Sequence, residues 1–369
     1  MSEFRIDQIK SQDATRGPEV AGITTFSGTS GIVIPSGNTD YRGGRGRAVF
    51  ARGYVDPAPS WPAVDITETV MIPTLGNAIE WGELVNNAVQ IGGASNSTRG
   101  IFAGGSPNET SVMNIASGGV INAGGNSNNS CGGFTIPRRG TATCSDTIRA
   151  FFAGGQQQSA PACGTHPQTT SDVIDYFLFE SLGKAIGFGD LTQNRRQLVG
   201  GFSSPTRGVF CGGYDGDTSP YARYNNIDYI TMATTGNAID FGDLSEAKSS
   251  SGGLSNSTRG MIAGGAALDP PRADRKLIEY VTISSTGNAQ DFGDLINTSH
   301  NRGAAATSIR GIFAGGYNRY APAPAVTGLS DIDYVTLAST GNGTDFGDLV
   351  RVGACGNDGG ISDSDGGLG

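Results

Sequence analysis

The stretch RGIFAGG at residues 310–316 is the sharpest copy of the motif that decides the fold. Its pattern is Arg-Gly, two apolar residues, a small residue and a double glycine. The second glycines of successive copies are about 50 residues apart, a period typical of the blades of β-propellers. The copies lie at residues 47–53, 99–105, 149–155, 207–213, 259–265 and 310–316. The sequence therefore predicts six blades.

A second motif follows the first in most repeats. In IDYITMATTGNAIDFGDL, residues 227–244, β-branched and aromatic residues flank a Gly-Asn pair suited to a tight turn. Each copy therefore predicts a β-hairpin. Close copies lie at 278–295 and 332–349, weaker ones at 67–84 and 174–191, and a degenerate one at 112–126.

The fourth strand of each blade is predicted from short glycine-rich stretches such as residues 198–202 and 250–257. Glycine is favoured where strands converge, so these strands are placed innermost in antiparallel four-stranded blades. The first repeat has no such strand of its own, whereas residues 350–361 have this composition with no repeat after them. We expect them to complete the first blade. Tyrosines and phenylalanines that recur in the hairpins are interpreted as packing between blades.

Composition excludes several classes of partner. The chain has 369 residues, 59 of them glycine, and a formal net charge of −9. Its basic residues are dispersed, so no basic face for nucleic acid or anionic membranes is predicted. No apolar run is long enough to span a bilayer, and the N-terminus has no signal-peptide core. Five cysteines, an odd number, favour a reducing compartment over a disulfide framework.

Three parts are predicted along the chain. Residues 1–44 form an extended N-terminal arm, residues 45–361 the propeller and residues 362–369 a C-terminal tail. The arm cannot build a core alone, and its alternating apolar residues are typical of a strand that docks on a partner or on copies of itself. The residues predicted to anchor it are Phe4, Ile6, Ile9, Ile23, Phe26, Ile32 and Ile34.

Two resemblances rest on these motifs. A double glycine after an apolar strand, then a tyrosine and a large aromatic, resembles the kelch repeat over residues 45–361, with Phe in place of the kelch Trp in most blades. The stretches at 3–10, 22–31 and 41–47, with the TGNAxDFGDL blocks, look like virion structural and tail-fibre-like proteins of contractile-tailed phages of marine cyanobacteria. The second resemblance covers nearly the whole chain and implies a component of the virion without implying a chemistry.

The loops after the double glycines are the predicted binding site. They vary in length and are rich in tyrosine and arginine, the residues enriched in recognition hot spots. The alternative is that they are ordinary rim loops whose aromatic residues only pack. The candidate binding residues are Trp61, Tyr214, Tyr221, Arg223, Tyr224, Arg272, Arg275, Tyr317, Arg319 and Tyr320.

Two columns of charged residues have a structural and a functional interpretation. The arginine of each first motif could form a cationic ring for an anionic glycan, but a residue present once per blade usually serves the blade, and pairing with a carbonyl or carboxylate of the same or the next blade is favoured. The aspartates of the hairpins are interpreted as turn residues. Asp363 and Asp365 resemble the start of a calcium loop whose remainder is missing.

Catalysis has little support in the sequence. The two histidines, His166 and His300, lie in no metalloprotease or serine-hydrolase motif, so we expect no enzyme, cofactor or metal site. The predicted function is that of a phage virion structural protein, anchored to other virion proteins by its arm, for decoration or attachment to a host-surface glycan or protein. The alternatives are a glycan-degrading propeller enzyme and a scaffold between other virion proteins. Homo-oligomerisation remains open.

Overall fold

A computed structural model of the chain describes residues 46–51, 53–55, 62–117, 120–123, 133–159, 168–181, 183–198, 200–218, 221–267, 273–318, 327–354 and 359–364. All of them belong to one compact unit, Gly37–Gly369. These residues form β-strands, turns and loops, and none of them is helical. A helix able to cross a bilayer is likewise not found in this part of the chain. The all-β class is confirmed, whereas the predicted arm, residues 1–44, lies outside the described residues.

The described strands form six four-stranded antiparallel sheets, which we number along the chain. Sheet 1 contains β35 (Gly360–Ser362), β1 (Arg47–Ala51), β3 (Ile66–Met71) and β4 (Ile79–Glu83). Sheet 2 contains β5 (Val89–Ser95), β6 (Arg99–Ser106), β7 (Glu109–Asn114) and β8 (Val120–Ala123). Sheet 3 contains β10 (Ala142–Ser145), β11 (Arg149–Ala153), β13 (Val173–Leu178) and β14 (Ile186–Asp190).

The remaining sheets repeat this pattern. Sheet 4 contains β15 (Gly200–Ser203), β16 (Arg207–Cys211), β19 (Asn226–Thr231) and β20 (Ile239–Asp243). Sheet 5 contains β22 (Gly252–Ser255), β23 (Arg259–Ala263), β26 (Leu277–Thr282) and β27 (Gln290–Asp294). Sheet 6 contains β28 (Gly303–Ala306), β29 (Arg310–Ala314), β32 (Asp331–Thr336) and β33 (Thr344–Asp348).

Short strands in the double-glycine loops and in the segments before the innermost strands form small additional sheets. They pair β2 (Tyr54–Val55) with β34 (Gly353–Ala354), β9 (Arg138–Arg139) with β12 (Gln156–Gln157), β17 (Tyr214–Asp215) with β18 (Ala222–Arg223), and β30 (Tyr317–Asn318) with β31 (Thr327–Gly328). A three-stranded one joins β21 (Lys248–Ser249), β24 (Ala266–Ala267) and β25 (Ala273–Asp274).

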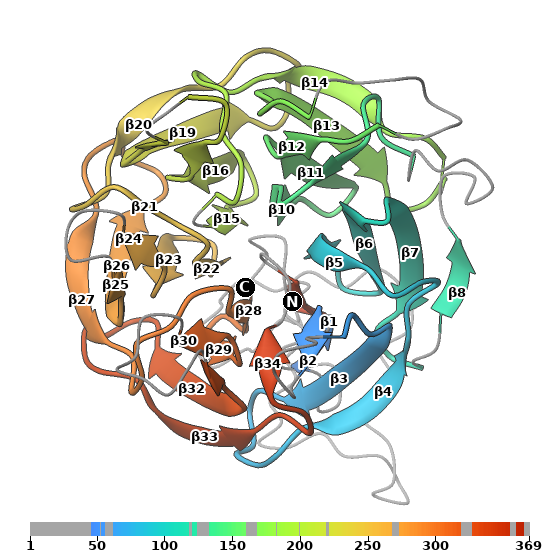
Figure 1. The fold of residues 1–369 in the computed structure, drawn as a ribbon. Helices are drawn as coiled ribbons and strands as arrows, with labels where there is room; N and C mark the ends of the chain where they lie inside the picture. Colours follow the sequence, from blue (N-terminus) through green and yellow to red (C-terminus); the bar gives the residue numbers. More distant parts are fainter. Residues whose placement is uncertain are drawn as a thin grey trace, which may run out of the picture. The chain divides into compact units, whose positions relative to one another are not determined.

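Within this unit, the sheets follow one another in a cycle around a common centre (Figure 1). Each innermost strand contacts the innermost strands of the two neighbouring sheets, in the order β35, β5, β10, β15, β22, β28 and back to β35. The outer strands β4, β14, β20, β27 and β33 lie at the periphery (Figure 1). This arrangement is consistent with the predicted propeller.

A separate apolar cluster fills the space between each pair of neighbouring sheets. Phe50 and Val70 of sheet 1, for example, pack with Ile312 and Phe346 of sheet 6. The other clusters join sheets 1 and 2, 2 and 3, 3 and 4, 4 and 5, and 5 and 6. Tyr334 lies edge-on to Phe346, with ring centroids 6.3 Å apart. The interpretation of the recurrent tyrosines and phenylalanines as packing between neighbouring sheets is thereby confirmed.

The recurrent glycines have two physical reasons. Both residues of the double glycine adopt positive φ, as at Gly264 (72°) and Gly265 (105°), which glycine adopts without strain. The innermost strands approach so closely that a Cβ on Gly200 would lie 2.7 Å from the Cα of Gly253 in the next sheet. The predicted glycine-rich inner strands are thereby explained by contact between backbones.

The Gly-Asn turn of one hairpin motif contacts the outer strand, with its Phe-Gly-Asp segment, of the motif in the preceding sheet. The Gly-Asn turn of sheet 4 packs on the outer strand of sheet 3: the Gly236 N–H donates to the Phe188 carbonyl (3.0 Å), and the Asp190 N–H donates to Asn237 Oδ1 (3.1 Å). A Cβ on Gly189 would collide with the Gly236 carbonyl, so this position requires glycine. The same interlock joins sheets 4 and 5, 5 and 6, and 6 and 1.

The arginine column links sheets, as the favoured interpretation predicted. The Arg259 guanidinium lies 4.4 Å from the centroid of Tyr280 and donates to the Leu337 carbonyl of sheet 6 (2.6 Å). Arg149 instead pairs with Asp146 of its own sheet, at 2.7 Å. The other arginines that donate to a carbonyl of the next sheet are Arg47, Arg99, Arg207 and Arg310.

Serine hydroxyls link the innermost strands around the centre. Five of the six innermost strands end in serine, and each hydroxyl donates to the carbonyl of the last residue in the preceding sheet's innermost strand, at 2.7–2.8 Å. The sixth, β28, ends in Ala306, which only accepts, from Ser362. The series of hydroxyl donors is therefore interrupted between sheets 6 and 5.

The C-terminal segment completes sheet 1, as predicted. β35 pairs with β1, with Ala48 opposite Ser362, so Ser362 of the predicted tail belongs to this strand. The carboxylate of Asp363 accepts from the backbone N–H groups of Gly46 (2.9 Å) and Arg47 (3.0 Å). The acidic residue that resembled a calcium ligand thus caps the start of the first repeat.

Replacement of Gly189 by alanine tests the interlock. We expect Gly189→Ala to lower the free energy of unfolding by about 1–3 kcal/mol, because the methyl group displaces the Gly236 carbonyl. Gly187→Ala, in the same strand, is the control, since a Cβ there meets no atom within 4 Å. Chemical denaturation measures both, and equal stability of the two variants would contradict the interlock.

Replacement of Ala306 by serine tests the series of hydroxyl donors. The new hydroxyl should donate to the Ser255 carbonyl and raise the free energy of unfolding by about 1 kcal/mol. Ser203→Ala, which removes the bond from Ser203 to the Ser145 carbonyl, should lower it by a similar amount. Thermal and denaturant unfolding measure both changes. Destabilisation by Ala306→Ser would show that the innermost strands leave no room for a sixth hydroxyl.

Candidate functional site

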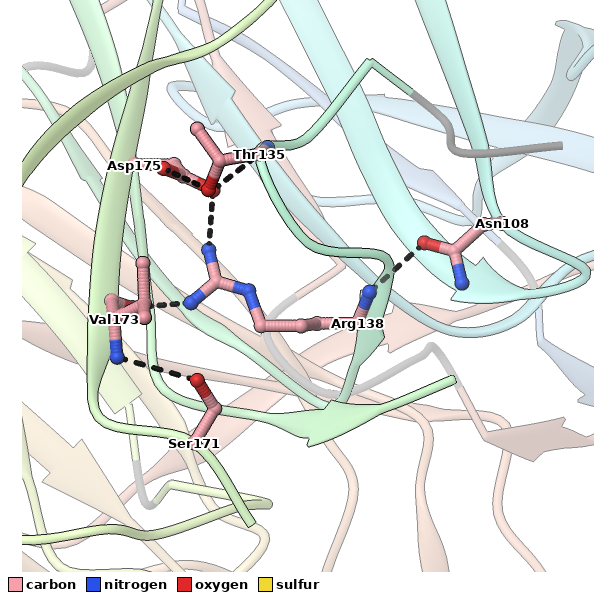
Figure 2. A network of polar contacts seen from close by, with 6 residues as sticks. All are labelled: Asn108, Thr135, Arg138, Ser171, Val173 and Asp175. Carbon is pink, nitrogen blue, oxygen red and sulfur yellow. Dashed lines mark hydrogen bonds and ion pairs between the residues drawn. The ribbon is translucent and has the colours of Figure 1, made fainter. Parts of the chain in front are cut away.

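A buried ion pair lies beneath the double-glycine loops of sheets 3 to 6. Figure 2 shows the pair in sheet 3, where Arg138 Nη2 donates to Asp175 Oδ2 at 2.7 Å and both side chains are fully buried. The Thr135 hydroxyl also donates to Asp175, at 2.8 Å. The corresponding pairs are Arg195 with Asp228, Lys248 with Glu279, and Arg302 with Asp331 and Asp333.

These ion pairs were missed in the sequence. The signal is an acidic residue next to the recurrent tyrosine inside an otherwise apolar strand, as at Asp175 and Asp228. Each carboxylate also accepts a backbone N–H from the segment after the preceding sheet's last strand, as Asp228 does from Thr192 (3.0 Å). Because a buried charge is tolerated only when it is paired and hydrogen-bonded, the pairs fix the bases of the loops.

Sheet 2 departs from this pattern. In sheets 4 and 5 the buried cation, Arg195 or Lys248, lies two residues before a residue with positive φ, Gln197 or Ser250. In sheet 2 the equivalent position, two residues before Gln90, is occupied by Ala88. The nearby carboxylate of Glu109 is 4% exposed and accepts a hydrogen bond from the Ser111 hydroxyl (3.2 Å), but no cation of the described residues pairs with it. Burial raises the pKa of Glu109 to about 7, and Asp65 adds to the rise. In sheet 5, by contrast, burial favours a raised pKa, but the charge of Lys248 and the hydrogen bonds from Lys248 and Ser245 together lower the pKa of Glu279.

The candidate binding site lies in the loops of sheet 4, next to the buried pair of Arg195 and Asp228. Arg196 follows Arg195 and exchanges backbone hydrogen bonds with Tyr214, at 3.0 and 3.1 Å. On its other side, Tyr214 is paired with Arg223 across β17 and β18. Residues directly opposite in antiparallel strands share a face, so the two arginines flank the tyrosine.

Arg196, Tyr214, Tyr221 and Arg223 form what we call the tyrosine cluster. The guanidinium carbons of Arg196 and Arg223 lie 4.8 and 5.6 Å from the centroid of Tyr214. Tyr221 lies edge-on to Tyr214 at 6.0 Å and is 56% exposed. Arg223 also donates to the Ser249 hydroxyl (2.6 Å) and to the Ala266 carbonyl, which ties the cluster to sheet 5. The cluster is a rigid aromatic platform with one ring open to solvent.

Three of the predicted binding residues, Tyr214, Tyr221 and Arg223, are therefore brought together. Tyr224 follows β18, donates its N–H to the Gly213 carbonyl (2.9 Å), and has a pKa raised by burial and by Asp215. Arg275 pairs with Glu246 at 2.8 Å. Tyr317 is 9% exposed and packs on His300 (5.5 Å), which contacts Asp274 (2.9 Å). Arg275 and Tyr317 thus belong to the loops of sheets 5 and 6.

The other predicted residues lie outside the described part of the chain. They are Trp61, Arg272, Arg319 and Tyr320 of the loops and Phe4, Ile6, Ile9, Ile23, Phe26, Ile32 and Ile34 of the arm. Arg196 is the member of the cluster that sequence reasoning missed. Its signal was the Arg-Arg pair at residues 195 and 196, because neighbours in an extended segment face opposite ways.

The buried carboxylate of Glu109 predicts a stability that depends on pH. Its folded-state pKa lies above the ordinary 4.5, so the folded protein is favoured while Glu109 stays protonated, and this advantage is lost as pH rises from about 4.5 to 7. Glu109→Gln should therefore stabilise the protein by up to about 3 kcal/mol at pH 8 and have little effect at pH 4.5. Unfolding at both pH values measures this, with Glu83→Gln as the control, because the Glu83 side chain is exposed. The same change at both pH values would contradict an ionisable Glu109.

Comparison with known proteins assigns no family to this arrangement. No protein-family model matches the chain, and a search of curated proteins found no match. The resemblance to phage virion proteins therefore stays an expectation, and the function is argued from the geometry.

Proposed function

We propose that the chain is a six-bladed, kelch-like β-propeller that serves as a structural protein of a phage virion and attaches the particle to the host surface. The cyclic order of the sheets and the apolar cluster between each neighbouring pair support the propeller. The virion assignment rests on the resemblance of the long sequence motifs to those of virion structural and tail-fibre-like proteins. The N-terminal arm would join the propeller to other virion proteins.

The observation that carries attachment is the exposure of Tyr221 on a fixed platform. A tyrosine supplies a large, rigid contact area, and its ordering on binding costs little conformational entropy. Tyr214 is held from both sides by paired strands, so the exposed ring keeps its orientation before a ligand arrives. Binding residues on loops above a rigid scaffold are the common arrangement for recognition.

Removal of the exposed ring tests attachment. We expect Tyr221→Ala to weaken binding of the purified protein to host cell envelopes roughly tenfold or more, the usual effect of losing one hot-spot residue. Ile309→Ala is the control, because Ile309 is 64% exposed and lies in the turn at the opposite end of the strands. A pull-down with labelled protein measures both variants. Equal binding by Tyr221→Ala and the wild type would contradict attachment through this face.

The arm and the absence of catalysis need separate tests. A chain without residues 1–44 should fail to enter particles, and its incorporation at normal occupancy would contradict anchoring by the arm.

Incubation of the purified protein with host polysaccharide should release no reducing ends. Their release would favour the alternative, a glycan-degrading enzyme.

A further inference from the structure

We propose that the tyrosine cluster recognises a saccharide that carries a carboxylate or sulfate group, with Arg196 as the contact to the anion. This inference rests on the proposed attachment function and names the class of its ligand. It follows from the geometry of Arg196, from the absence of a partner for its charge in the described residues, and from the polar groups around Tyr221.

The guanidinium of Arg196 is held in place by packing. It stacks on Tyr214, with 4.8 Å to the ring centroid. It also packs against the backbone of Gly216, where a Cβ would lie 2.5 Å from Nε and closer still to the rest of the group. The neighbouring Arg195 is anchored by Asp228 and by the carbonyls of Gly212 (3.1 Å) and Asn226 (2.9 Å). Little conformational freedom is therefore left to lose on binding.

The guanidinium of Arg196 has no partner for its charge among the described residues. In the described residues its side chain has neither a carboxylate within ion-pair distance nor a hydrogen-bond acceptor, and its Nε is buried without a partner. Five other cations on this face of the sheets, Arg138, Arg195, Lys248, Arg275 and Arg302, are each paired with an acid, whereas Arg223 and Arg139 donate to uncharged groups. A planar guanidinium with unused N–H groups matches the two oxygens of a carboxylate or sulfate.

The surroundings favour an acidic saccharide over a nucleic acid or a polyphosphate. The apolar C–H face of a sugar packs on an aromatic ring, and Tyr221 offers one that is 56% exposed. Asp215 and Asp217 lie on the same loop and are held there by hydrogen bonds, including one from the Thr170 N–H to Asp217 (2.6 Å). Their carboxylates can accept hydrogen bonds from sugar hydroxyl groups, and they repel further anionic groups of a ligand. A ligand with isolated acidic groups among hydroxyls fits, whereas a nucleic acid or polyphosphate does not.

The experiment uses two pairs of polymers that differ in charge. The pairs are polygalacturonate with its methyl ester, and dextran sulfate with dextran. Titration calorimetry at low salt should show that the full chain binds at least one acidic polymer roughly tenfold or more tightly than its neutral partner. Added salt should weaken this binding. Comparable binding of the acidic and neutral members in both pairs, or of none of the four polymers, would overturn the acidic class.

Variants assign the preference to Arg196. Arg196→Gln should remove the preference for the acidic polymer, and Gly216→Ala should weaken it by displacing the guanidinium. Arg139→Gln is the matched control, because Arg139 lies in the loops of the same face and already bonds Gln156, at 2.9 Å. Melting temperatures of all variants show whether they fold. A preference that survives in folded Arg196→Gln overturns the role of this residue.

The two proposals fail in different ways. If Tyr221→Ala weakens binding to host envelopes while Arg196→Gln binds the acidic polymer as the wild type does, attachment stands and the anion contact is wrong. If Tyr221→Ala leaves envelope binding intact but Arg196→Gln loses the acidic polymer, the site binds acidic saccharides without serving attachment through Tyr221.

Discussion

Packing of each sheet against two neighbours is the constraint on which the rest of the structure depends. A four-stranded sheet with two apolar faces is not stable alone, and here each face contributes to a cluster shared with the adjacent sheet. The polar links all serve this packing. Arginines link every sheet except sheet 3 to the next near the start of the second strands. Gly-Asn turns join the outer strands of four pairs of sheets, and serine hydroxyls join the innermost strands. The same links connect sheet 6 with sheet 1, and the hydroxyl bond among them comes from Ser362 of the C-terminal strand β35.

The repeated motifs predicted the strands well because each motif residue has a contact that recurs. Gly189 is required by the turn of the next sheet, and Asn237 by the Asp190 N–H, so spacing along the chain reports geometry. The buried ion pairs were not predicted, because their cations do not keep one position. Arg195 and Lys248 precede a residue with positive φ by two places, whereas Arg302 follows such a residue, Asn301. A pairing in space can thus be conserved between repeats while the sequence position of one partner moves.

The contacts within the candidate site were also not predictable from sequence position. Tyrosines in the variable loops indicated a binding face, but the sequence gives no means of choosing which of them meet. Tyr214 and Tyr221 meet because short strands bring the loop back on itself, and Tyr317 is buried because His300 lies against it. Arg195 and Arg196 are adjacent and chemically identical, yet one is buried with Asp228 and the other packs on Tyr214. The direction of each side chain follows from strand pairing, which the composition of a loop does not reveal.

Sheet 2 lacks several residues of the repeat motif but still packs between sheets 1 and 3. Val120 and Lys184 occupy the positions where the other turns have the asparagine of the interlock, and Ala88 replaces the buried cation. The inner links are nevertheless intact: the Ser95 hydroxyl bonds the Ser362 carbonyl, and the Ser95 carbonyl accepts from Ser145. Packing, the hydroxyl bonds at the centre and the arginine links from Arg47 and Arg99 therefore hold this sheet between its neighbours without the asparagine interlock. Local opening requires the least free energy where such links are fewest, so in the described chain the periphery of sheet 2 should open before the corresponding parts of sheets 4 to 6.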